Sequence, residues 1–115
     1  MAATSRRFYV YTVASISGTL YIGLTNKLHK RIWQHKQGEI EGFTKRYEVK
    51  RLLYFESFDE VRTAINREKQ LKGWSRRKKV WLIEQFNPGW QDLSREWYDD
   101  RGPSTPFGSA ELRSG

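Results

Sequence analysis

The stretch that decides the fold is YVYTVASISGTLYIG, residues 9–23. Two runs rich in tyrosine and β-branched residues, FYVYTVA (8–14) and TLYIGL (19–24), are typical of β-strands. The intervening SISG (15–18) contains the serine and glycine of a turn. The pattern therefore predicts an antiparallel hairpin with tyrosines at both ends.

The length of the hairpin loop decides which face each tyrosine takes. With an odd-length loop, odd-numbered residues of both strands share one face, whereas an even loop would separate the tyrosines. In the odd-loop interpretation one face carries Tyr9, Tyr11, Val13, Tyr21 and Gly23. The opposite face carries Phe8, Val10, Leu20, Ile22 and Leu24, and this apolar side is the expected core face.

A first helix is predicted in TNKLHKRIWQHKQG, residues 25–38. Asn26 or Thr25 can cap its start, and Gly38 can end it. Its short apolar stripe is Leu28 and Ile32, and this stripe is flanked by Arg31 and His35.

A third strand and a second helix follow. KRLLYFESF (50–58) has the composition of a strand. Ser57 and Glu60 have the spacing of a capping box, which predicts a helix through about Lys72 with Gly73 as its stop.

Ser75 is the predicted cap of a third helix, RRKKVWLIEQF (76–86), which Asn87-Pro88 closes. The segment WQDLSREWYDD (90–100) is compatible with a short fourth helix or with an irregular wrap. In either case it would return three apolar side chains to the core, namely Trp90, Leu93 and Trp97.

The order ββα-β-αα predicts a small α+β domain over residues 1–98, in which a three-stranded antiparallel sheet is flanked by helices. Residues 99–115 are rich in glycine, serine and proline, which predicts a flexible C-terminal tail.

Composition restricts the classes of function. A net charge of +8 on 115 residues favours a polyanionic partner, nucleic acid before an anionic membrane surface, although solubility alone is also compatible with it. The chain has no cysteine and only two histidines, so we expect any metal to be a hard ion on oxygen ligands. The sequence contains neither a signal-peptide pattern nor a run of transmembrane length, which predicts a cytoplasmic protein without membrane contact.

Glu68 is the most informative anomaly in the sequence. The second helix has an apolar stripe of Val61, Ala64, Ile65 and Leu71, and Glu68 falls within it. An ionised carboxylate facing a core is costly unless it is paired or bound to a metal. Either Glu68 pairs with a nearby arginine or lysine, or it is a metal ligand.

These residues resemble the GIY-YIG endonuclease superfamily, and in particular its small single-domain members. YVY (9–11) stands where the first triplet of the family stands, and Tyr21-Ile22-Gly23 is its second triplet unaltered. KLHKRIWQH resembles the helix that carries the family's arginine, here Arg31, with His35 four residues later. INREKQLKGW resembles the segment with the metal-binding glutamate, here Glu68, and the resemblance extends over about residues 6–98.

The resemblance implies a nuclease that uses one divalent ion, Mg²⁺ or Mn²⁺, held by Glu68. Tyr21 would activate or position the attacking water, and Arg31 would stabilise the charge that develops on the phosphate. Tyr11 and His35 would orient water or substrate, with His35 as a competing candidate for proton transfer. Gly23 would allow the backbone to approach the substrate closely.

The chain also departs from the family pattern. Tyr9 replaces the usual glycine of the first triplet, and Leu24 follows YIG where some members have lysine. Some members have an asparagine about a dozen residues after the glutamate, where this chain has Val80. Asn87 lies seven residues further on and is no safe substitute. These departures concern activity more than fold.

A basic surface is predicted between residues 62 and 79, where eight lysines or arginines accompany a single acid, Glu68. Such a surface binds the phosphate backbone without reading bases, so we expect low sequence specificity. The residues expected to bind nucleic acid, Gly23 included, are Lys72, Trp74, Arg76, Arg77, Lys78 and Lys79. Trp33 and Trp74 are the expected stacking residues, whereas Trp81 is expected in the core.

The sequence therefore predicts a monomeric, metal-dependent DNA endonuclease, for which an unidentified protein partner could supply specificity. The main alternative is a non-catalytic nucleic-acid-binding module on the same scaffold. A basic adaptor for other proteins is a third class, and no motif supports it.

Overall fold

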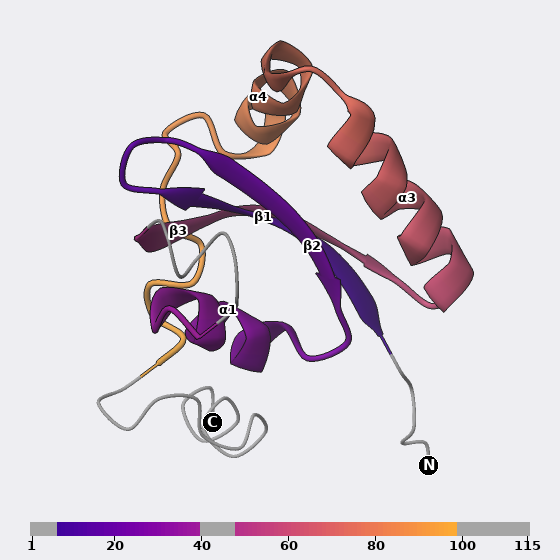
Figure 1. Cartoon of the computed structure of the whole chain (residues 1–115), viewed down its shortest axis with the longest axis horizontal. Coiled ribbons are helices and arrows are strands. Elements are labelled where there is room, and N and C mark those ends of the chain that lie inside the picture. The colour runs from indigo at the N-terminus through magenta and orange to yellow at the C-terminus, as the bar shows by residue number, and fades with distance from the viewer. Residues whose placement is uncertain (1–6, 40–47, 99–115) are drawn as a thin grey trace.

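A computed structural model describes residues 7–39 and 48–98 of the chain. Its sheet has the order β2-β1-β3, and both neighbouring pairs are antiparallel (Figure 1). The strands are β1 (Phe8–Ser15), β2 (Leu20–Thr25) and β3 (Val49–Phe58), and the helices are α1 (Leu28–Lys36), α3 (Val61–Gly73) and α4 (Arg76–Phe86). The predicted α+β architecture is confirmed.

The hairpin has the odd-length loop that places the tyrosines together. Tyr11 pairs with Gly23 and Val13 with Tyr21, so the odd-numbered residues of both strands share a face. The turn closes because the Ser15 amide donates to the Thr19 carbonyl at 2.9 Å and the Gly18 amide donates to the Ser15 carbonyl at 3.0 Å. Gly18 has a φ of 95°, a conformation that glycine adopts at little cost and that suits a three-residue hairpin loop.

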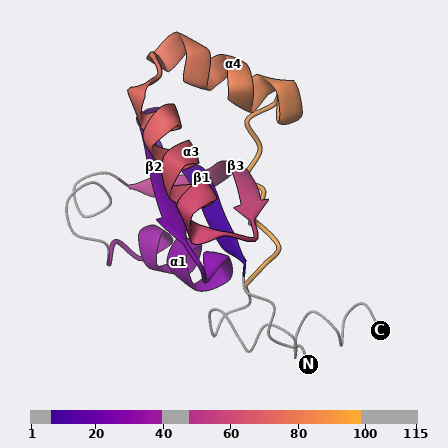
Figure 2. The same cartoon turned by 90° about the vertical axis from the view of Figure 1, so that its right-hand side faces the viewer.

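Both faces of the sheet are covered, α1 lying on one side and α3 with α4 on the other (Figure 2). The expected core face is confirmed, since Val10 and Ile22 pack in a buried cluster with residues of α3 and α4. The tyrosine face has a core of its own, in which Tyr11 and Val13 pack against α1. Tyr11, the first tyrosine of the candidate site, is therefore part of this second hydrophobic core.

The predicted helix starts are correct in one case and wrong in two. Ser75 caps α4, accepting a hydrogen bond from the Lys78 amide at 3.2 Å. The N-cap of α1 is Lys27 rather than Asn26 or Thr25, although the Thr25 hydroxyl accepts from the Lys27 amide at 2.9 Å. The box of Ser57 and Glu60 does not form, because Ser57 is still inside β3, paired with Tyr9.

The helix ends are also close to their predicted positions. Gly38 follows the C-cap of α1 with a φ of 74°, as expected for the stop of a helix. Gly73 is still the last helical residue of α3, and the chain leaves the helix at Trp74.

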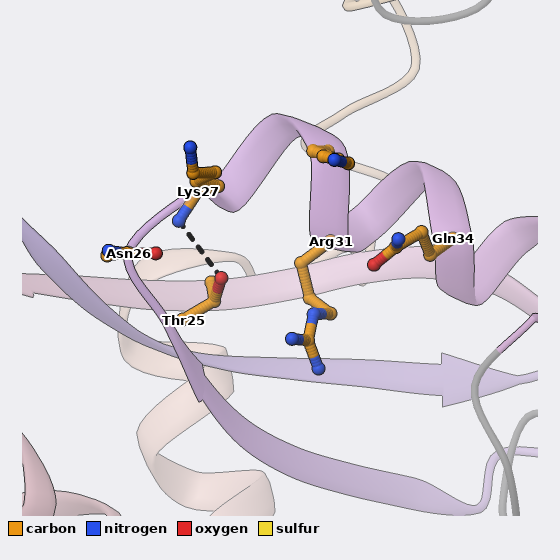
Figure 3. Close-up of a pocket in the computed structure, with 6 residues that line it drawn as sticks. Thr25, Asn26, Lys27, Arg31 and Gln34 are labelled. Carbon is orange, nitrogen blue, oxygen red and sulfur yellow. Dashed lines mark hydrogen bonds between the residues drawn. The ribbon is translucent and has the colours of Figure 1, made fainter.

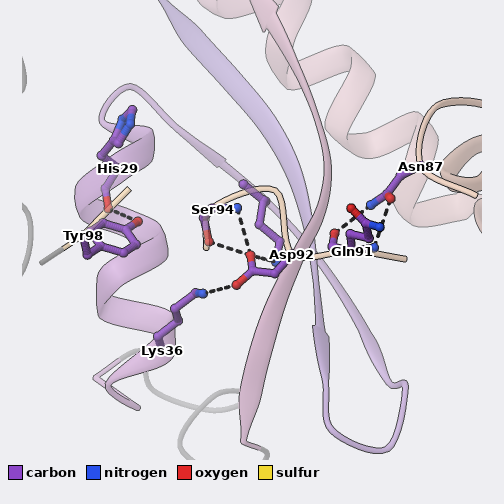
Figure 4. Close-up of polar contacts among 8 residues, drawn as sticks. His29, Lys36, Asn87, Gln91, Asp92, Ser94 and Tyr98 are labelled. Carbon is purple, nitrogen blue, oxygen red and sulfur yellow. Dashed lines mark hydrogen bonds and ion pairs between the residues drawn. The ribbon is translucent and has the colours of Figure 1, made fainter. Parts of the chain in front are cut away.

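Residues 87–98 form the irregular wrap, not a fourth helix, and two polar residues, the buried Asn87 and the half-buried Asp92, attach it to β3 (Figure 4). The Asn87 side chain donates to the Leu53 carbonyl at 3.0 Å. Asp92 accepts from the Leu52 amide at 3.0 Å and pairs with Lys36 of α1 at 2.5 Å. The wrap therefore links the last helix to the sheet and to α1, and residues 99–115 lie outside the described residues.

Three expected core residues lie at the surface. Leu93 is 40% exposed, while Trp90 and Trp97 pack on the cores as expected. Val61 is 45% exposed, because it begins α3 beyond the edge of the buried stripe. Trp81 is 54% exposed: on α4 the buried positions are Leu82 and Ile83, and Trp81 precedes them on the outer side.

Candidate active site

A buried phenol and imidazole form the centre of the candidate site. The Tyr11 hydroxyl and His35 Nε2 are 2.7 Å apart, and both side chains are fully buried. Tyr11 comes from the central strand and His35 from the last turn of α1, which lies across the tyrosine face. Among the described residues, His35 Nδ1 is the buried side-chain atom without a hydrogen-bond partner, a feature more typical of functional sites than of cores.

The environment fixes the charge of this pair at neutral pH. Burial, and then repulsion from the Arg31 guanidinium, lower the pKa of His35 to about 4. Burial, with a smaller contribution from Tyr21, raises the pKa of Tyr11 above its ordinary value. Both groups are therefore neutral near pH 7, and neither carries a charge into the core.

Gly23 makes room for the Tyr11 ring. A Cβ atom at position 23 would lie 2.6 Å from Cζ of Tyr11, closer than two carbon atoms can approach. This close approach explains a glycine in the second triplet, directly across the strand pair from Tyr11. Gly23 is buried beneath the phenol, so its position does not support the direct contact with nucleic acid that the sequence suggested.

Tyr21 and Arg31 are the half-buried members of the cluster. The Tyr21 ring lies 5.0 Å from the His35 ring and 6.4 Å from the Tyr11 ring, measured between centroids. Arg31 is close enough to Tyr11 and His35 to influence the pKa of both groups. Tyr21 is thus the phenol that solvent or a substrate can reach, and Arg31 supplies positive charge beside it.

Glu68 approaches the cluster from α3, on the other side of the sheet. Its side chain is only 18% exposed, and it contributes to the raised pKa of Tyr11. It also forms an ion pair with Lys72, one turn later on α3, at 3.0 Å. The first interpretation that the sequence left open, pairing with a lysine, is confirmed, and the Glu68 charge also acts on the Tyr11 phenol.

The donor set around Glu68 fits one hard cation held only in part by the protein. Among the described residues, no three carboxylates or histidines gather where they could hold a metal ion. Mg²⁺ commonly takes one or two carboxylates and completes its shell with water and substrate phosphate. A single, mostly buried carboxylate whose charge acts on the Tyr11 phenol satisfies that requirement.

The basic segment is less uniform than its sequence suggests. Arg67 pairs with Glu56 at 2.9 Å, and Lys72 pairs with Glu68. Trp74 is packed against the core, with the Lys78 ammonium 4.3 Å from its ring centroid. The Trp74 indole therefore already contacts Lys78 and the core, which leaves less of the ring available to stack on a base.

Exposed cations of this segment lie on both helices, namely Arg62, Lys69 and Lys72 on α3 and Arg76, Arg77 and Lys78 on α4. Arg76 donates to the Gly18 carbonyl at 2.9 Å, which places the start of α4 beside the hairpin turn. Arg77, Lys78 and Ser75 line an open hollow together with Trp81. The sequence analysis missed Trp81, because its apolar neighbours suggested a core position. Trp33, the other expected stacking residue, lies against Tyr98 with ring centroids 5.1 Å apart.

Two further cations were also missed. Lys27 and Lys30 line a polar pocket with Arg31 at the beginning of α1 (Figure 3). Lys30 and Arg31 follow Lys27 by three and four residues, which places all three near one side of a helix, and this signal was available in the sequence.

Comparison with known proteins identifies the family. Residues 7–80 match the sequence model described as the GIY-YIG catalytic domain. The chain belongs to the GIY-YIG family. The match includes all the clustered residues described above.

Relatives of similar size support this assignment. A UPF0213 protein of Staphylococcus saprophyticus is 37% identical over 79 residues, which cover 69% of this chain and 96% of that protein. A UPF0213 protein of Bacillus pumilus is 36% identical, with 68% of this chain and 80% of the relative covered. The solution NMR structure of a UPF0213 protein from Bacillus halodurans superposes with a TM-score of 0.51 at 27% identity, covering 78% of this chain and 97% of that one.

These comparisons support the fold and a nuclease-like role. The names of the relatives assign no substrate. In the described part of the chain, no helix combines the length and apolar character needed to cross a membrane.

Proposed function

We propose that this protein is a divalent-metal-dependent endonuclease that hydrolyses phosphodiester bonds in DNA with low sequence specificity. The observation that carries the proposal is the cluster of Tyr11, Tyr21, Arg31 and His35, with the Glu68 carboxylate beside it. It combines a proton acceptor, a cation and a hard-metal ligand, which phosphodiester hydrolysis requires.

Each side chain has a role that follows from its exposure. Tyr21, which is half-buried, would position the attacking water and accept its proton. Arg31 would bind the scissile phosphate, because its planar fork suits phosphate oxygens and it sits on the same side as Tyr21. The buried Tyr11–His35 pair would act as positioning residues that hold Tyr21 and Arg31 in place.

A neutral His35 also provides a proton acceptor next to the reacting groups. With its pKa near 4, His35 is unprotonated at neutral pH but is a weak base, so it would hold a proton from Tyr11 or Tyr21 only transiently. Mg²⁺ or Mn²⁺ bound at Glu68 would supply Lewis-acid stabilisation of the phosphate.

The proposed nucleic-acid surface is the exposed side of α4. Arg77 and Lys78 would neutralise phosphates, and Trp81, which lines the same hollow, would stack on a base. Such contacts follow the backbone and carry little sequence information.

One observation favours the alternative of a non-catalytic binding module. The Glu68–Lys72 ion pair already satisfies the carboxylate that a metal would need. In that case the basic surface would bind nucleic acid while the site remained inactive.

Cleavage assays separate the two candidates. Purified protein is incubated with supercoiled plasmid, single-stranded DNA and branched DNA in Mg²⁺, Mn²⁺ or EDTA. The variants are Glu68→Gln, Tyr21→Phe and Arg31→Gln, with Glu60→Gln as a control that removes an exposed carboxylate just before α3. We expect metal-dependent cleavage that falls about 100-fold or more in the three site variants and persists in the control. Cleavage of equal rate in all the proteins would point to a contaminant, and salt-sensitive binding without cleavage would identify the binding module.

A further inference from the structure

A polar pocket opens where β2 leads into α1. It has a volume of about 150 Å³, and Figure 3 shows its lining residues spread from the end of β2 along the helix to Gln34. The lining residues are Thr25, Asn26, Lys27, Lys30, Arg31 and Gln34. Apart from Arg31, none of them belongs to the cluster around Tyr11.

The lining chemistry selects an anion. Three of the six side chains are cationic, two are amides that can donate hydrogen bonds, and none is a carboxylate. The Thr25 hydroxyl accepts from the Lys27 amide, and its O–H can still donate to an anion. The volume suffices for a phosphate group with a few waters, and lysine and arginine donors bind phosphate through charge-assisted hydrogen bonds.

Arg31 connects this pocket to the candidate active site. Arg31, which lines the pocket, also interacts through its side chain with the Tyr11 phenol. An anion in the pocket and a phosphate beside Tyr11 would therefore lie on either side of one arginine, which is how neighbouring phosphates of a single strand would be arranged.

We propose that the Lys27–Lys30 pocket holds a second phosphate of the substrate strand, adjacent to the scissile phosphate at Arg31. The inference rests on the proposed function and deepens it. The preferred ligand is a strand with two neighbouring phosphates, and a lone phosphate is a poor one. The pocket would thereby fix which bond along the strand reaches Tyr21.

Binding of two small probes tests the proposal without relying on cleavage. Thymidine 3′,5′-bisphosphate and thymidine 3′-monophosphate are titrated into the full-length protein in EDTA at 0.15 M salt and followed by amide NMR shifts. The variant is Lys27→Gln/Lys30→Gln, in which both altered side chains are exposed, so the fold is retained. Arg95→Gln, which removes an exposed cation in the wrap of residues 87–98, is the control for the loss of charge.

For the wild type we expect the bisphosphate to bind about tenfold more tightly than the monophosphate, with shifts at Thr25 to Lys27. In the double variant the ratio should fall to about one, and in Arg95→Gln it should persist. Equal binding of the two probes by the wild type, or an unchanged ratio in the double variant, would refute the proposal that this pocket holds a second phosphate.

The two proposals can fail separately. Metal-dependent cleavage in a protein that shows no preference for the bisphosphate would refute the pocket alone. A preference that Lys27→Gln/Lys30→Gln abolishes, in a protein that cleaves no DNA, would support the pocket as a phosphate site and refute the endonuclease.

Discussion

Replacing Gly23 with alanine should destabilise the fold and disturb the candidate site together. The added Cβ would lie 2.6 Å from Cζ of Tyr11, and the ring cannot yield freely because it is fully buried. Inserting a methyl group into a packed core costs about 1–3 kcal/mol. With a urea m-value of about 1–3 kcal/mol/M for a small protein, the unfolding midpoint should fall by roughly 1 M.

The same clash should separate Tyr11 from His35, whose hydrogen bond is 2.7 Å long. Urea unfolding measures the loss of stability, and the NMR signals of the His35 ring report the contact with Tyr11. Gly73→Ala is the matched control, since a Cβ there meets nothing within 4 Å. It should leave stability unchanged or raise it by about 0.5–1 kcal/mol, as for alanine in a helix.

A double variant sharpens this test. Tyr11→Leu removes the atoms that the new methyl group would meet, so Gly23→Ala should cost less in that background than in the wild type. If Gly23→Ala is as stable as the wild type, or costs the same in both backgrounds, the argument that the glycine seats the phenol is refuted.

Three further predictions concern the wrap, the imidazole and α4. Asp92→Asn should lower stability by about 3 kcal/mol at neutral pH, because it breaks a mostly buried pair with Lys36. Burial raises the pKa of Asp92, but hydrogen bonds from Lys36 and other donors outweigh burial and hold the pKa below its ordinary value. The stability difference between Asp92→Asn and wild type, measured by urea unfolding, should therefore shrink as the pH falls below about 4. The His35 ring should titrate near pH 4 by NMR, whereas the same residue in the unfolded chain titrates near 6.5. The free energy of unfolding should therefore fall by roughly 3 kcal/mol as the pH is lowered from 6.5 to 4. A titration of His35 near 6.5 in the folded protein would contradict its burial. Trp81→Ala should weaken binding of single-stranded DNA by about tenfold, whereas Phe86→Ala at the far end of α4, also exposed, should not; equal effects in fluorescence anisotropy would rule out stacking on Trp81.

The sequence predicted the fold well because its strongest signals are local. The hairpin follows from alternating residues and a turn whose glycine takes a positive φ, and Ser75 caps its own helix. The capping box at Ser57 failed because pairing with Tyr9 extends β3, and a partner distant in sequence outweighed the local pattern.

Side-chain environments were harder to predict. The anomaly at Glu68 was visible from helical periodicity, but its pairing with Lys72 and its nearness to Tyr11 depend on how α3 lies across the sheet. Trp81 was misplaced because an apolar run does not reveal which side of a helix is covered. Full burial of His35 follows from the docking of α1 on the tyrosine face, which no local pattern fixes.

The most direct test of the account compares two variants that break the same ion pair. Glu68→Gln and Lys72→Gln both remove the 3.0 Å contact on α3, so an effect of the pair on stability would appear in both. The measurement is the rate of DNA cleavage as a function of Mg²⁺ concentration. If Glu68 is the metal ligand, Glu68→Gln loses about 100-fold or more of the rate, while Lys72→Gln cleaves and reaches half-maximal rate at less Mg²⁺. Equal rates in the two variants, or cleavage by Glu68→Gln at the wild-type rate, would contradict the account.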